Sequence, residues 1–109
     1  AWDWTMMIMQ PDWVTPDLVA ESVRAVEKKG LPALHKLRLE GYHEGLSVQI
    51  LHVGSYEDEG PTLARLHDER IPQNGYGTNG KHHEIYLGDP RRVAPEKLRT
   101  VLRQPIREI

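Results

Sequence analysis

The alternation of apolar and polar residues predicts five strands along the chain. It appears at residues 2–9, 37–40, 46–53, 82–87 and 98–104. A period of two residues is typical of a strand whose two faces meet different surroundings. In the first segment Trp4 and Met6 share a face, and both faces carry bulky side chains. We expect the last strand to close at Pro105, because proline cannot donate a hydrogen bond to a neighbouring strand.

Two helices are predicted between these strands. The first covers about residues 16–29, because Thr15 supplies a capping hydroxyl and Pro16 suits the first helical position. The second follows the acidic residues 57–59, whose charge offsets the positive end of the helix dipole, and ends at Pro72. The apolar residues expected to face inward on this helix are Leu63 and Leu66. Helices separated by pairs of strands favour an α+β fold, an antiparallel sheet with helices on one face.

The remaining segments predict connections. The glycine- and asparagine-rich stretch 74–80 is expected to be a flexible loop, and residues 94–96 a single helical turn. The chain of 109 residues has room for one hydrophobic core at most.

Composition and charge exclude several classes of protein. With 39% hydrophobic and 28% charged residues, the chain has an ordinary globular composition. A formal charge of −2 argues against a basic nucleic-acid binder and against a polybasic membrane-surface protein. The sequence shows no apolar run long enough to cross a bilayer and no signal peptide, so we expect a cytoplasmic protein without membrane partners. The absence of cysteine excludes disulfides and thiolate metal ligands.

The histidines do not predict a metal site. His82 and His83 are adjacent on a predicted strand and therefore point to opposite faces. The sequence contains no HxH or HxxxH pair. His52 is expected at a strand end, and the three histidines expected at the surface are His35, His43 and His67.

The predicted strand 82–87 carries the most informative chemistry. Glu84 and Tyr86 are two residues apart, so their side chains point the same way. A carboxylate beside a phenol can act as a base with a hydrogen-bond donor, or can hold a polar or cationic ligand. The alternative is a solvent-facing polar side of an edge strand. In both interpretations Ile85 and Leu87 lie on the other face and enter the core.

Three ordered blocks of sequence resemble the GyrI-like small-molecule-binding family. They are residues 4–12 (WTMMIMQPD), 48–61 (VQILHVGSYEDEGP) and 82–98 (HHEIYLGDPRRVAPEKL). The resemblance implies a SOUL-like fold of two strand–helix–strand–strand units with a ligand cleft between them. It also implies one domain over residues 1–109 that is incomplete at its N-terminus, with the first unit largely missing, in a bacterial protein.

The resemblance also implies site residues. The cleft glutamate of the family corresponds to Glu84 and its neighbouring tyrosine to Tyr86, and these two are the expected catalytic pair if the protein is an enzyme. The ligand-binding residues that we expect are Trp4, Met6, His52, Tyr56, Glu84 and Tyr86, with Trp2 as an alternative aromatic wall. We expect neither a metal nor another cofactor.

Three functions follow as hypotheses. The first is a protein that binds bulky apolar or cationic xenobiotics through aromatic faces and a buried Glu84. The second is a stand-alone hydrolase of strained electrophiles such as cyclopropanoids, with Glu84 as the acid or base and Tyr86 as the hydrogen-bond donor. The third is a protein-interaction module that inhibits an enzyme such as gyrase. We also expect the strand at 2–9 to be covered by a second copy of the chain or by an N-terminal fragment.

Overall fold

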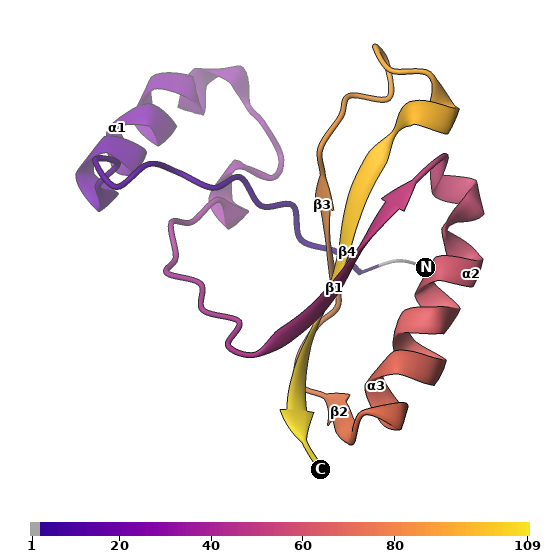
Figure 1. Ribbon diagram of the computed structural model, residues 1–109. Coiled ribbons are helices and arrows are strands. Elements are labelled where there is room, and N and C mark those ends of the chain that lie inside the picture. The colour runs from indigo at the N-terminus through magenta and orange to yellow at the C-terminus, as the bar shows by residue number, and fades with distance from the viewer. Residues whose placement is uncertain (1–2) are drawn as a thin grey trace. The chain divides into compact units, whose positions relative to one another are not determined.

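The structure, a computed structural model, describes residues 3–109. The chain divides into two compact units, Ala1–Tyr42 and His43–Ile109, whose elements are shown in Figure 1. Trp2, one expected aromatic wall, lies outside the described residues. No helix in residues 3–109 has both the length and the apolar character needed to span a membrane.

The first unit is built around one helix. Helix α1 spans Pro16–Val26 and continues into a 3-10 turn, Glu27–Lys29, which confirms the helix predicted over 16–29. The hydroxyl of Thr15 accepts a hydrogen bond from the backbone N–H of Leu18 at 3.2 Å, as an N-cap does. Gly30 ends the segment with φ 63°, a left-handed conformation that favours glycine.

Two strands predicted in the first unit are wrong. Residues 3–9 are exposed and form no strand, and residues 37–40 are likewise outside any strand. A short 3-10 turn, Leu34–Lys36, precedes the second of these segments. Alternation predicts two faces, but a strand also needs a partner for its backbone hydrogen bonds, and the described residues provide none to 3–9.

The second unit holds a four-stranded antiparallel sheet with β4, Arg99–Glu108, in the middle. Strand β1, Ser47–Val53, pairs along one edge of β4. Strands β3, His83–Tyr86, and β2, Tyr76–Thr78, pair one after the other along the opposite edge (Figure 1). The structure therefore confirms the α+β class with an antiparallel sheet.

Two details of the sheet differ from the sequence prediction. Part of the expected loop 74–80 is strand β2, and β4 continues three residues beyond Pro105. The pairing partner of β4 changes from β3 to β2 around Pro105, so its missing N–H interrupts no ladder on that edge. The Pro105 carbonyl still accepts a hydrogen bond from the N–H of Asn79 at 2.8 Å.

A helical segment covers one face of this sheet (Figure 1). It begins as a 3-10 turn, continues as α2 and a π-helical stretch, and ends as α3, with Pro72 inside the last element. The four elements are Tyr56–Glu59, α2 Gly60–Ala64, Arg65–Arg70 and α3 Ile71–Gln73. The predicted helix up to Pro72 is confirmed, and so is the helical turn near 94–96, a 3-10 turn at Pro95–Lys97.

The core lies between this helical segment and the sheet. Its buried residues are Leu66, Ile71, Leu102 and Ile106, with Val48, Ile50, Leu63 and Tyr76 packed against them. On β4 the even-numbered residues 100–106 are all buried, so one face of the strand meets the helices. Burial of each large apolar side chain contributes about 1.5–3 kcal/mol. Leu63 and Leu66 face inward as predicted.

Candidate functional site

The register of the sheet places Glu84 and Tyr86 on the face that the helices cover. Directly opposite residues in an antiparallel pair share a face. Glu84 lies opposite Leu102, which is fully buried, and Tyr86 lies opposite Thr100. We call this side the helix-covered face; in the sheet it carries His52, Glu84, Tyr86, Thr100, Leu102 and Gln104.

The sequence prediction for the faces of β3 is therefore wrong. Ile85 and Leu87 were expected in the core, yet Ile85 is half-buried and Leu87 is 50% exposed. Glu84 lies neither in the core nor on a solvent-facing side of an edge strand. Its side chain is 24% exposed, at the margin of the helix-covered face.

Glu84 and Tyr86 contact each other as their spacing predicts. The Tyr86 hydroxyl donates a hydrogen bond to Oε2 of Glu84 at 2.8 Å. The Tyr86 ring meets the ring of Tyr56 edge to face, with 5.5 Å between centroids. Both tyrosines are exposed, at 59% and 40%. The site therefore presents two aromatic rings beside a partly sheltered carboxylate.

Tyr86 remains a hydrogen-bond donor over the whole neutral range. Burial raises the pKa of Tyr86 to about 12, with further contributions from its hydrogen bond to Glu84 and from the charges of Glu84 and Glu59. The phenol keeps its proton at neutral pH and holds Glu84 in one orientation.

A second carboxyl group, from Glu59, adjoins Glu84. Glu59 is 7% exposed, and its carboxyl group lies beside that of Glu84. Burial, as the largest cause, and the neighbouring Glu84 together raise the pKa of Glu59 to about 7, and His52 opposes the rise. Two carboxyl groups in contact, one with a pKa near neutrality, form an acid–base pair.

Glu59 is not among the site residues expected from the sequence, although a signal for it exists. The sequence prediction treats the acidic residues 57–59 only as charges at a helix N-terminus. Glu59, Leu63 and Leu66 follow the i, i+4, i+7 spacing of one helix face. Since the two leucines were expected to face inward, the same spacing places Glu59 inward as well.

His52 links the end of β1 to the helical segment through its two ring nitrogens. It is 7% exposed, and its Nε2 lies 2.9 Å from the Ser55 carbonyl oxygen. A carbonyl only accepts, so Nε2 carries a proton and donates. Its Nδ1 lies 3.3 Å from the Thr62 hydroxyl. Both ring nitrogens are therefore occupied, and a direct contact of His52 with a ligand stays a prediction.

Thr100 completes the floor of the site. It lies on β4 between His52 and Tyr86 and is fully buried. Among the described residues, its hydroxyl oxygen has no hydrogen-bond partner. Such an unpaired buried hydroxyl is uncommon and is a feature of polar sites that take up water or a ligand.

A histidine pair also adjoins Glu84. Nε2 of His67 lies 3.3 Å from Nδ1 of His82, and Nε2 of His82 lies 3.6 Å from Oε1 of Glu84. Burial, aided by the charge of His82, lowers the pKa of His67. The prediction that His67 is a surface residue is wrong, because the π-helical stretch places it, half-buried, against His82. Within residues 3–109, no group of three or more potential ligand residues could hold a metal ion.

The opposite face of the sheet carries a network of paired charged residues. His83 Nδ1 lies 2.6 Å from Oε1 of Glu44, and Arg103 donates to Oε2 of the same carboxylate at 3.1 Å. Arg103 also donates to Gln49 at 2.8 Å. This network joins three strands and the segment before β1. Its charged groups are paired with one another, as in a network that stabilises the fold.

Trp4 and Met6, two expected ligand contacts, belong to the first unit. Their side chains are 69% and 76% exposed. Their contact with a ligand stays a prediction.

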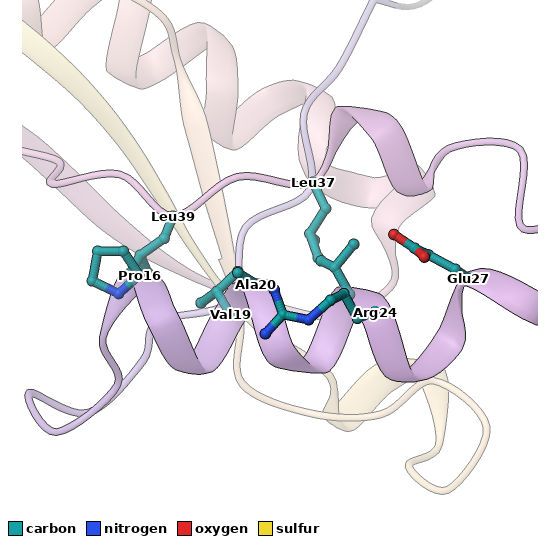
Figure 2. A pocket seen from close by; sticks show the side chains of 8 residues that line it. Pro16, Val19, Ala20, Arg24, Glu27, Leu37 and Leu39 are labelled. Carbon is teal, nitrogen blue, oxygen red and sulfur yellow. The ribbon is translucent and has the colours of Figure 1, made fainter.

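The first unit has an open depression of about 420 Å³ on helix α1. Figure 2 shows Leu39 beside Pro16 and Leu37 beside Arg24, both over helix α1. The second unit has a hollow of about 360 Å³ at β1, lined by Ile50, Tyr76 and two arginines among others. Neither hollow contains Glu84 or any other of the expected site residues.

Comparison with known proteins identifies the family. Residues 17–107 match the family described as GyrI-like small molecule binding domain. A comparison with the curated proteins finds no match.

Three solved structures from Listeria innocua resemble the chain. Two are hydrolases, each 34% identical, with TM-scores of 0.74 and 0.73. The third is an uncharacterized conserved protein, 37% identical, with a TM-score of 0.78. The matches cover 90% of this chain but only 50–52% of the others, so the chain spans about half the length of these structures. Because the family matches over most of the sequence, the chain belongs to the GyrI-like small-molecule-binding domain family.

Proposed function

We propose that this domain binds an organic cation, with the charged group against Glu84 and the apolar part on the rings of Tyr56 and Tyr86. The observation that carries the proposal is the carboxylate of Glu84, oriented by Tyr86 at 2.8 Å and flanked by two exposed aromatic rings. The family's character as a small-molecule-binding domain supports it.

The physical basis is the combination of charge and aromatic surface. A cation over a tyrosine face gains about 0.5–2 kcal/mol, depending on how well water is excluded. Glu84 is partly sheltered, so its attraction for a cation is screened less than that of an exposed carboxylate. Holding Glu84 in one orientation before binding lowers the entropy cost of the contact.

The test compares a permanent cation with its neutral isostere. The probes are 2-naphthyltrimethylammonium and 2-tert-butylnaphthalene, whose shapes match and whose charges differ. Glu84→Gln should weaken binding of the cation about tenfold or more and leave the neutral probe unchanged. The exposed Glu96, in the turn Pro95–Lys97, supplies the matched control Glu96→Gln. Equal losses for both probes would show that Glu84 supports the fold rather than the ligand.

Hydrolysis of a strained electrophile is the second candidate. It is favoured by the contact of the carboxyl groups of Glu59 and Glu84 beside a protonated phenol, and two of the similar structures are hydrolases. In this reaction Glu84 takes a proton from water as the water oxygen bonds to a ring carbon. The strained C–C bond breaks, its electron pair moves into a conjugated carbonyl, and Tyr86 turns its single O–H from the now protonated Glu84 to the resulting oxyanion, to which it donates a hydrogen bond.

The second test follows ring opening of a cyclopropanoid electrophile by absorbance. Wild-type protein should turn over the compound, and Glu84→Gln should reduce the rate about a hundredfold or more. Tight binding of the compound without turnover would contradict hydrolysis and leave the binding function in place.

A further inference from the structure

The carboxyl groups of Glu59 and Glu84 lie beside each other in a sheltered position. A hydrogen bond between two carboxyl groups requires a proton on one of them, because an ionised carboxylate only accepts. Two carboxylates in contact also repel each other, and one of them then retains its proton to a higher pH. The pair therefore holds one proton and one negative charge near neutral pH.

The surroundings decide which glutamate carries the proton. Glu59 is 7% exposed, and among the described residues its Oε1 has no hydrogen-bond partner. A negative charge on an unpaired buried oxygen is far more costly than a neutral carbonyl oxygen there. Glu84 is more exposed and accepts the hydrogen bond of Tyr86. The proton therefore lies on Glu59, and the charge lies on Glu84.

The groups around Glu59 agree with this assignment. Glu84 and Tyr86 face it from β3, and the first of these adds negative charge. His52 faces it from β1 and favours the ionised form, but burial and Glu84 outweigh it and bring the pKa of Glu59 to about 7. β4 contributes the neutral Thr100 to this face. On its own segment Glu57 and Asp58 are exposed.

We propose that Glu59 holds a proton for Glu84, and that a cation bound at Glu84 displaces this proton into water. The inference rests on the proposed function, and Glu59 acts through Glu84 as a positioning residue. The O–H bond of Glu59 breaks, the proton passes to a buffer base, and the charge of the pair changes from −1 to −2. The positive charge of the ligand compensates this added negative charge.

Proton release links binding to pH. A ligand that favours the ionised pair binds more tightly once the pair is ionised, and the linkage is reciprocal. The affinity of wild-type protein for 2-naphthyltrimethylammonium, whose own charge does not change with pH, should rise several-fold between about pH 6 and pH 8. The rise should be clearly smaller in Glu59→Gln, which imitates the protonated form.

Calorimetry measures the released proton directly. The same probe is titrated at pH 6.5 in phosphate and in imidazole, whose ionisation enthalpies differ, and the difference in heat gives the protons released. Wild type should release a measurable fraction of a proton, and Glu59→Gln should release clearly less. Glu57→Gln, two residues away and exposed, is the matched control and should behave as wild type.

A measurement without ligand separates the possible failures. Carbon-13 NMR of the glutamate side chains should show one carboxyl that titrates near pH 7 in wild type and is missing in Glu59→Gln. If Glu59 titrates in the ordinary range of glutamate, the inference is overturned whatever binds. Binding without proton release would also overturn it but would leave the proposed function intact. Absence of binding, with Glu59 titrating near pH 7, would refute the proposed function and the displacement together.

Discussion

Each face of the sheet has a sheltered glutamate, and the groups that surround the two glutamates have opposite effects on their charge. On the opposite face, the side chain of Glu44 is 12% exposed and contacts both His83 and Arg103. On the helix-covered face, Glu59 is 7% exposed, and its neighbour is another carboxyl, that of Glu84. The first glutamate is surrounded by groups that favour its charge, and the second largely by groups that oppose it.

This difference separates a structural site from a functional one. A carboxylate held between the guanidinium of Arg103 and the imidazole of His83 fixes the positions of the strands that carry them. A carboxyl held against a second carboxyl under a helix makes the fold less stable at neutral pH, and such perturbed groups cluster at functional sites. The comparison can be tested by changing each face in turn.

The largest effect is expected from the core of the helix-covered face. Leu102→Ala removes a fully buried side chain and should lower the free energy of unfolding by about 2–5 kcal/mol. Ile85→Ala, at a half-buried position pointing the other way, should cost about 1 kcal/mol. Urea denaturation measures both, and equal losses would show that the two faces are packed alike.

The next effect is a pH dependence of stability. The unfolded chain ionises Glu59 near its ordinary pKa of 4.5, whereas the folded protein retains the proton up to about pH 7. The folded state binds more protons in this window, so stability should fall as the pH rises from 4.5 to 7, by up to about 3 kcal/mol.

The variant Glu59→Gln isolates this pH effect. The lowered pKa of His67 acts in the opposite direction, since it makes stability rise with pH below about 6.5. Subtracting the pH curve of Glu59→Gln from that of wild type removes the contribution of His67. Parallel curves for the two proteins would refute a raised pKa for Glu59.

A smaller change in stability, opposite in sign to that of Glu59→Gln, is expected from Glu44→Gln. It removes the charge that pairs with His83 and Arg103 and should cost about 1–2 kcal/mol at pH 8. At the same pH, Glu59→Gln should leave stability unchanged or increase it. Thermal denaturation of the two variants side by side checks the contrast, which fails if both changes destabilise the protein equally.

The smallest change in stability is expected from Tyr86→Phe. Tyr86 is 59% exposed, and its hydroxyl donates its hydrogen bond to Glu84 at the margin of the sheet. The free energy of unfolding should therefore fall by less than about 0.5 kcal/mol. Affinity for the cationic probe should nevertheless fall a few-fold, because Glu84 loses the donor that orients it. A loss of several kcal/mol in stability would make Tyr86 a core residue instead.

Local signals in the sequence were sufficient for much of the fold. Thr15 and Pro16 define the start of α1 because the cap and the first turn involve only neighbouring residues. The alternation in 46–53 predicts β1, and the spacing of Leu63 and Leu66 predicts the helix face. The pair of Glu84 and Tyr86 also follows from the period of two within one strand.

Features that depend on distant partners were not predictable in the same way. Residues 3–9 alternate like a strand, but among the described residues no partner completes one. The short β2 depends on pairing with the end of β4, about thirty residues away in the sequence. Which face of β3 meets the helices is fixed by its register with Leu102 and Thr100, so alternation alone pointed Ile85 to the wrong side.

The most direct test of the account is to locate the bound cation on the sheet. Two-dimensional NMR of the labelled protein, titrated with 2-naphthyltrimethylammonium, reports which side chains are perturbed. The account predicts the largest changes at Tyr56, Glu59, Glu84 and Tyr86, and none at Gln49, His83 or Arg103. The largest changes on the opposite face, with Glu84 and Tyr86 unaffected, would contradict it.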